Sequence, residues 1–231
     1  MVSALDRWSF RSWLHLTVAA LAVATLLGAG QSRTVRADNW DSYSPGPLDL
    51  SGTWRVYPFY ERGAFKNPPA IVADEGRPVL RLVTEGEAMR IGRSLSLDVR
   101  QTPWLVWEWK ALVLPDGGDV RQRQRNDQAA RVMLVFEGMK AVAYMWDSQA
   151  PVGTEVLPDE LEMFQRALIV VRSGPTGLGQ WSRQERDVYR DYRKAFGEEP
   201  RALKWLGLES HSNDTKTHTA ALFGSVFFES R

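Results

Sequence analysis

The sequence contains no cysteine among its 231 residues and only three histidines. The missing thiols exclude disulfide bonds, cysteine nucleophiles and every metal site that uses cysteine ligands. A folded domain of this chain must therefore be held together by its own apolar core. About 190 residues outside the first segment are enough to bury such a core.

The sequence also lacks a large excess of either charge, with 29 basic and 28 acidic side chains. Residues 1–37 hold four of the basic and one of the acidic side chains, so the remainder carries 25 and 27, a formal charge of −2. Nucleic-acid binders normally carry a clear basic excess on one face. We therefore expect no nucleic-acid partner.

The longest apolar run lies at the start of the chain. Arg7 and Arg11 precede an apolar segment, residues 13–30, and small residues at Val35 and Ala37 follow it. This pattern is typical of a signal peptide over residues 1–37 that is cleaved after Ala37. The alternative is an uncleaved membrane anchor, because roughly 18 to 20 apolar residues span a bilayer. In both cases we expect a periplasmic or secreted protein, with a linker at 38–47 and one domain at 48–231.

Three tryptophans occur within six residues in the segment 103–113. Alternate side chains of a strand share a face, so Leu105, Trp107 and Trp109 are predicted to lie in the core. The opposite face carries Trp104 and Glu108 beside apolar residues. A strand of this kind has one face buried and the other partly open to water or to a ligand.

The remaining pattern is mainly β. Two short apolar runs, residues 131–136 and 140–146, are separated by three residues that include Gly138, which predicts an antiparallel hairpin. The one strongly helical segment is about 183–196, with Ser182 and Glu185 as a capping box. Frequent turns and about ten strands predict a jelly-roll-like antiparallel β-sandwich with one packed α-helix, rather than alternating βαβ units.

Several polar motifs accompany the tryptophan strand in a fixed order. They are Asn126-Asp127-Gln128-Ala129-Ala130-Arg131-Val132, Tyr144-Met145-Trp146, Arg172-Ser173-Gly174, residues 185–197 and Asn213-Asp214-Thr215. Together they resemble the bacterial domain-of-unknown-function family three-zero-four-seven (DUF3047) over about residues 50–228. The resemblance implies an exported, β-rich bacterial domain. The chain departs from the family's more acidic pattern at Asn126-Asp127 and at residues 209–214, which argues against a metal site.

Six charged residues form the first candidate site: Glu108, Asp127, Arg131, Arg186, Asp187 and Asp191. If they converge, acids kept ionised by nearby arginines can bind a hydroxyl-rich ligand through paired hydrogen bonds. The simpler interpretation, which we favour, is structural. In it, Arg131 or Arg186 pairs with Asp187 or Asp127 and fastens the helix to the sheet.

Aromatic side chains form the second candidate. Trp104, Trp146, Trp181 and Tyr144 could present flat apolar faces to sugar rings, and Trp104 is favoured because it lies on the mixed face of its strand. His211, His218 and Asp214 could meet around a metal, but a surface loop is the simpler interpretation, and we expect no metal or cofactor. We interpret the chain as a non-catalytic ligand-binding domain for a saccharide or another cell-envelope component. The alternatives are an accessory subunit of a membrane-associated complex and a glycan-active hydrolase that uses two acids across a groove.

Overall fold

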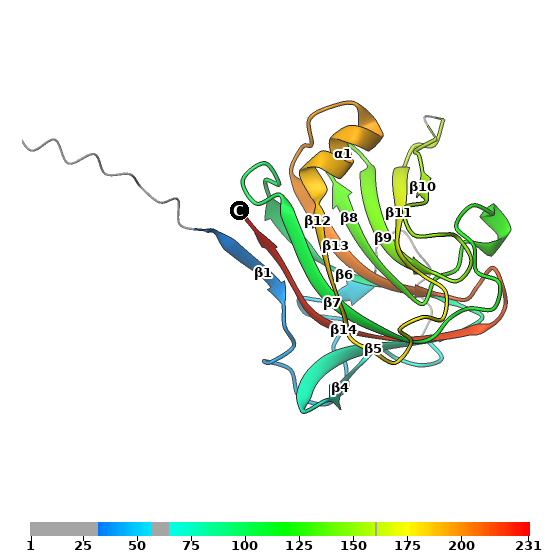
Figure 1. The fold of residues 1–231 in the computed structure, drawn as a ribbon. Helices are drawn as coiled ribbons and strands as arrows, with labels where there is room; N and C mark the ends of the chain where they lie inside the picture. Colours follow the sequence, from blue (N-terminus) through cyan, green and yellow to red (C-terminus); the bar gives the residue numbers. More distant parts are fainter. Residues whose placement is uncertain (1–31, 57–64, 160) are drawn as a thin grey trace, which may run out of the picture. The chain divides into compact units, whose positions relative to one another are not determined.

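The computed structural model describes residues 32–56, 65–159 and 161–231, which form two facing β-sheets and one α-helix (Figure 1). The first sheet contains β1 (Thr34–Asp38), β2 (Gly46–Pro47), β4 (Ala70–Asp74), β5 (Arg77–Glu85), β7 (Trp104–Val113), β12 (Ser182–Asp187) and β14 (His218–Glu229). The second contains β3 (Arg55–Val56), β6 (Ala88–Leu97), β8 (Ala130–Phe136), β9 (Lys140–Asp147), β10 (Glu155–Val156), β11 (Gln165–Ser173) and β13 (Leu203–His211). The predicted β-sandwich with one packed helix is confirmed.

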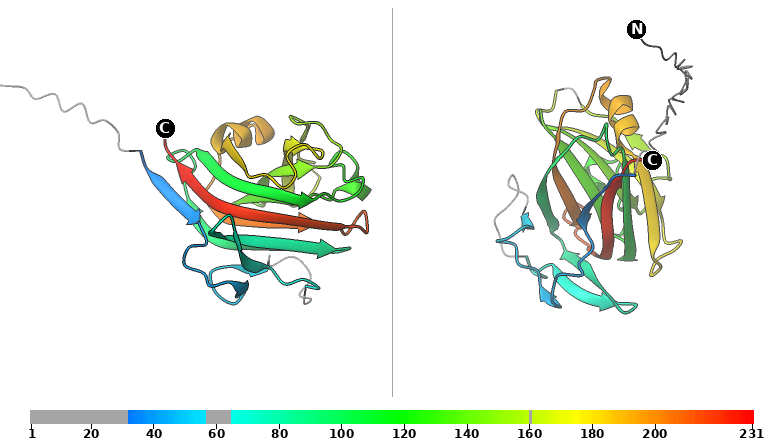
Figure 2. Two further views of the ribbon diagram at one scale, coloured as in Figure 1. Left: turned by 60° about the horizontal axis from the view of Figure 1, so that its bottom comes forward. Right: turned by 90° about the vertical axis from the view of Figure 1, so that its left-hand side faces the viewer.

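In the first sheet β14 lies between β7 and β5, as Figure 2 shows with the red strand between the green and the teal ones. That sheet runs β12-β7-β14-β5-β4-β2, with β1 also paired to β14. The second sheet runs β10-β11-β9-β8-β13-β6-β3. All the pairs that the structure describes are antiparallel except β9 with β11. The predicted hairpin is present as β8 and β9, joined by a turn in which Gly138 has a φ of 95°.

The alternation on β7 builds the core as predicted. Leu105, Trp107 and Trp109 are fully buried. Trp107 stacks on Tyr144 of β9 with ring centroids 5.3 Å apart, and Trp109 lies 6.3 Å from Trp146. These large rings close the space between the two sheets, and each removes about 150–250 Å² of surface from water.

The helix is shorter than predicted. Residues 182–187 form strand β12, which pairs with β7 from Ser182 opposite Trp109 to Asp187 opposite Trp104. The helix α1 (Val188–Phe196) starts after Asp187, whose side chain accepts a hydrogen bond from the Arg190 backbone N–H at 2.9 Å. The predicted capping box was wrong, because residues 182–187 pair with the edge of β7 and form a strand in place of the first turns of the helix. Gly197, in the left-handed conformation, ends the helix.

Residues 34–47 belong to the folded body. Strand β1 pairs with β14, Asp38 is buried, and buried Trp40 donates from its indole to the Gly224 carbonyl at 2.8 Å. The apolar part of the predicted signal or anchor, residues 13–30, lies outside the described residues. Among those that are described, no helix has the length and apolar character needed to cross a membrane.

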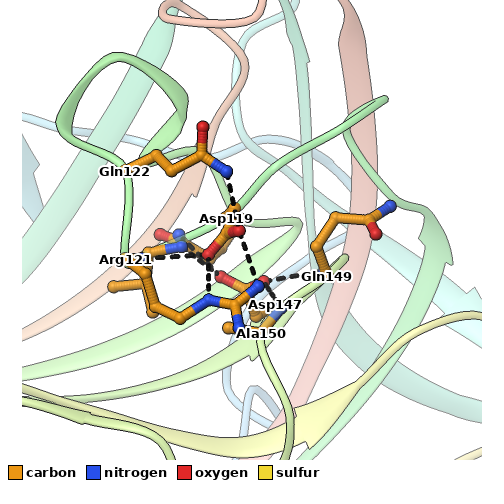
Figure 3. A network of polar contacts seen from close by, with 8 residues as sticks. Asp119, Arg121, Gln122, Asp147, Gln149 and Ala150 are labelled. Atoms are coloured by element: carbon orange, nitrogen blue, oxygen red, sulfur yellow. Dashed lines mark hydrogen bonds and ion pairs between the residues drawn. The ribbon is translucent and has the colours of Figure 1, made fainter.

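The polar loop after β7 is fixed to the end of β9 (Figure 3). The buried Asp147 carboxylate accepts backbone hydrogen bonds from Val120, Gln149 and Ala150 at 2.7–2.9 Å. Asp119, in the same loop, pairs with Arg121 at 2.8 Å. Burial raises the pKa of Asp147 against these hydrogen bonds. This loop follows the C-terminal end of β7, whereas Trp104 begins the strand at its other end.

Candidate functional site

Four of the eight predicted site residues line one groove of about 410 Å³ where β7, β12 and α1 meet. They are Trp104, Arg186, Asp187 and Asp191, and the lining is completed by Glu155, Glu185, Arg190 and Lys194. A second hollow of about 470 Å³ shares Asp187, Arg190 and Lys194 with this groove. The volume of the groove falls in the range of small-molecule sites in proteins.

The floor of the groove is an ion pair fixed from two sides. Arg186 donates to both carboxylate oxygens of Asp191, at 2.9 and 2.7 Å, and the Tyr144 hydroxyl donates to the same carboxylate at 2.8 Å. Burial, followed by the Asp191 charge, raises the pKa of Tyr144 well above its usual value, so the hydroxyl remains a donor. The predicted pairing of Arg186 with Asp187 was wrong, because Asp187 caps α1 while Asp191 lies one turn further along the helix.

Strand register builds one wall of the groove. Asp187 of β12 and Glu229 of β14 both lie directly opposite Trp104 of β7. Directly opposite residues point to the same face of a sheet, so the indole has a carboxylate on each side. Arg231 lies over this ring, with its guanidinium 4.3 Å from the ring centroid. It also bonds Glu185 at 2.5 Å and Glu229 at 2.9 Å.

Two other predicted residues lie outside the groove. Glu108 lies further along the same face of β7, where it pairs with Arg77 at 2.7 Å and accepts from Ser225 at 3.2 Å. Trp146 is fully buried in the core and donates to the Gly174 carbonyl at 3.0 Å. Burial of the Trp146 ring rules it out as a platform for a ligand in this structure.

Asp127 and Arg131 belong to a separate buried cluster on the second sheet. Arg131 lies 3.5 Å from Glu209, and the His211 Nε2 atom lies 3.1 Å from the same carboxylate. Asp127 instead accepts from the backbone of Asp214 and Thr215 at 2.9 and 2.7 Å, which fixes the turn before β14. The predicted Arg131–Asp127 pair is therefore replaced by Arg131–Glu209.

The pKa values of both acid–base groups in this cluster, Glu209 and His211, lie below their usual values. Burial alone would raise the pKa of Glu209, but contacts with His211, Arg131 and Arg90 outweigh it and lower the pKa to about 2. Burial and then the two arginines lower the pKa of His211 to about 3, so the imidazole is neutral near pH 7. The described residues hold no group of three or more histidine, aspartate or glutamate side chains placed to bind a metal ion.

Sequence reasoning missed Glu185 in the groove, Glu229 and Arg231 beside Trp104, and Glu209 in the buried cluster. Alternation alone places Glu209 and His211 on one face of a strand. Their partner Arg131 follows only from the β8–β13 register, in which Glu209 lies opposite Arg131. The same holds for Glu229 and Trp104, which are distant in the sequence and adjacent across β7 and β14.

Solved structures with a similar arrangement include three carbohydrate-related proteins. The endoglucanase Cel12A from Rhodothermus marinus has a TM-score of 0.47 and 11% identity, covering 86% of this chain and 100% of its own. The xyloglucanase domain of NopAA from Sinorhizobium fredii has a TM-score of 0.46 and 7% identity, covering 77% and 93%. The family 30 carbohydrate-binding module from Clostridium thermocellum has a TM-score of 0.38 and 11% identity, covering 85% and 96%. At these TM-scores the likenesses assign no function to the chain.

No curated protein matches the sequence. The model of one family, described as a protein of unknown function (DUF3047), matches residues 53–227, which include both the groove's strands and its helix. The chain therefore belongs to the DUF3047 family.

Proposed function

We propose that the exported domain, residues 38–231, binds a saccharide of the cell envelope in the groove of β7, β12 and α1 without catalysing a reaction on it. The observation that supports this most is the aromatic ring of Trp104 beside a fixed set of charged hydrogen-bonding groups in one groove of about 410 Å³. Sugar rings offer apolar C–H faces and hydroxyl edges, and this groove presents partners for both.

Rigidity of the polar groups supports a binding role. Asp191 is held by Arg186 and Tyr144, and Lys194 pairs with Glu155 at 2.6 Å. Groups that are already ordered lose little conformational entropy when a ligand binds, so more of the interaction free energy appears as affinity.

The state of the acids supports binding without hydrolysis. A glycosidase needs one carboxyl with a raised pKa as the general acid. In the groove, Asp191 is paired with Arg186, and Asp187 caps the helix. Hydrogen bonds from Arg231 and Arg183 lower the pKa of Glu185. These acids are suited to accept hydrogen bonds from hydroxyls.

A glycan panel read by thermal shift tests the proposal. A ligand at 100 times its Kd stabilises the native state by about 2.7 kcal/mol, which is a measurable rise in Tm. At the same ligand concentration, tenfold weaker binding by Trp104→Ala should cut the stabilisation to about 1.4 kcal/mol or less. Trp181→Ala, which removes a tryptophan outside the groove, should preserve the full shift. A panel of neutral, acidic and amino glycans that leaves the wild-type Tm unchanged would contradict the proposal.

Hydrolysis is a second candidate, favoured by one observation in the other cluster. Burial and then the charge of Asp127 raise the pKa of Asp214, whose backbone N–H donates to the Asp127 carboxylate at 2.9 Å. If this pair cleaves glycans, the wild type should release reducing sugar and Asp214→Asn should not. No release from the substrates that bind would exclude this candidate.

A further inference from the structure

A cation already lies over the Trp104 ring, in a position that Trp104, Glu185 and Glu229 form and that we call the seat. The Arg231 guanidinium lies 4.3 Å from the centroid of the indole and bonds two carboxylates, Glu185 at 2.5 Å and Glu229 at 2.9 Å. An aromatic face with acids at its edge is the arrangement that proteins use to hold organic cations. Arg231 therefore shows which chemical group the Trp104 ring and these two acids accept.

The seat is built by the sheet itself rather than by Arg231. Trp104 lies between Asp187 and Glu229 across three adjacent strands, and Glu185 is two residues before Asp187 on the same face of β12. The side chains of Glu185 and Glu229 remain 37% and 20% exposed with Arg231 in place, so a ligand can reach them. Removal of Arg231 would leave one aromatic face and two carboxylates without the cation that they share, with Arg183 still bonded to Glu185 at 2.8 Å.

We infer that this seat takes the ammonium group of an unacetylated amino sugar, an inference that rests on the proposed saccharide function of the same groove. The ammonium group would replace the Arg231 guanidinium over Trp104 and bond Glu185 and Glu229. The sugar's hydroxyls would then face the Arg186–Asp191 pair. A neutral hexose or an N-acetylated sugar has no charge to offer the two carboxylates.

The other end of the groove favours a sugar over a cationic peptide. Arg190 and Lys194 line the groove beside α1. Lys194 is paired with Glu155 at 2.6 Å, so the charge of Arg190 is what opposes a second guanidinium or ammonium group at that end, and a chain of basic residues is disfavoured. A saccharide could place its amine at Trp104, beside the carboxylates of Glu185 and Glu229. Its hydroxyls would then lie near α1, beside the donors of Arg190 and Lys194.

Arg231 then acts as an internal competitor for the seat. Its cation–π contact and its exposed ion pairs must be given up before an amine can bind, and contacts of these kinds together correspond to about a three- to thirtyfold change in affinity. Arg231→Ala should therefore tighten binding of an amino sugar by a factor in that range. Arg123→Ala, which removes an exposed arginine of the loop after β7, is the matched control and should have no effect.

The test is isothermal titration calorimetry of the full chain with a glucosamine tetramer and with its N-acetylated counterpart. We expect the wild type to bind the amine form about fivefold or more tightly, with a preference that shrinks at high salt and at a pH that deprotonates the amine. The double variant Glu185→Gln/Glu229→Gln should lose this preference and keep its affinity for the acetylated form. Glu137→Gln, in the distant β8–β9 turn, is the control for removal of a surface carboxylate.

The outcomes separate this inference from the proposed function. Equal affinity for the two tetramers, in the wild type and in Arg231→Ala, would overturn the amino-sugar seat and leave saccharide binding intact. Binding of another glycan with no binding of the glucosamine tetramer would do the same. Binding of an arginine-rich peptide in place of the glucosamine tetramer would also overturn it. If no saccharide of any class binds, the proposed function fails, and the inference fails with it.

Discussion

Acid should destabilise the fold through His211 well before most carboxylates titrate. The imidazole lies buried on β13 beside Glu209, and burial and two arginines lower its pKa to about 3 in the native state. In the unfolded chain a histidine has a pKa of about 6.5. Between these values the unfolded state binds a proton that the native state does not. The native state is therefore favoured in full above pH 6.5 and loses stability as the pH falls toward 3.

The size of the effect follows from the two pKa values. One differential proton changes the free energy of unfolding by about 1.4 kcal/mol per pH unit once the unfolded histidine is protonated. Between pH 7.0 and 5.0 the His211 contribution is about 2 kcal/mol. Below about pH 4.5, Glu209 adds a loss in the same direction, because its native pKa of about 2 lies below its unfolded value.

Urea unfolding followed by tryptophan fluorescence at pH 7.0, 6.0 and 5.0 measures this slope. His211→Gln should be less stable at pH 7.0 but should lose about 2 kcal/mol less than the wild type on going to pH 5.0. His218→Gln, which removes the exposed histidine that begins β14, controls for loss of a surface imidazole. A wild-type slope retained in His211→Gln would refute the assignment of a buried neutral imidazole.

Two further predictions concern the fold, and a third concerns export. Asp187→Ala removes the N-cap of α1 and should lower the free energy of unfolding by about 1 kcal/mol without unfolding the chain, measured in urea; a loss of several kcal/mol would contradict the cap assignment. Gly92→Ala would place a Cβ against the Trp205 indole and the Leu206 carbonyl, so its Tm should fall by the equivalent of roughly 3 kcal/mol, and an unchanged Tm would contradict this packing. We propose that the chain is exported, and intact-mass measurement should find a mature protein that begins at Asp38; a mass that includes residues 1–37 would support the uncleaved anchor.

Local sequence patterns were sufficient to predict the fold class and the strand that forms the core. The alternation on β7 identified Trp107 and Trp109 as core, and Gly138 marked the β8–β9 turn. The start of α1 was wrong because a capping-box pattern at Ser182 is a local signal, whereas β12 forms through pairing with β7. Pairing with a distant strand overrides a modest helical preference.

The candidate site was predicted only in part, for the same physical reason. Trp104 and the charged residues near α1 could be named because they are close in sequence or alternate on one strand. Their partners could not be predicted, because they are distant in sequence and become neighbours only when strands pair. Glu229 lies opposite Trp104, and Glu209 lies opposite Arg131. Long-range pairing decided which of the predicted residues share a groove.

Calorimetric titration of the best glycan from the panel into the wild type and Trp104→Ala tests saccharide binding in the groove most directly. We predict measurable binding by the wild type and an affinity about tenfold lower or worse in Trp104→Ala at an unchanged Tm, because an aromatic contact corresponds to roughly 1 kcal/mol beyond its buried area. Equal affinity in the two proteins would place the ligand elsewhere and contradict the groove.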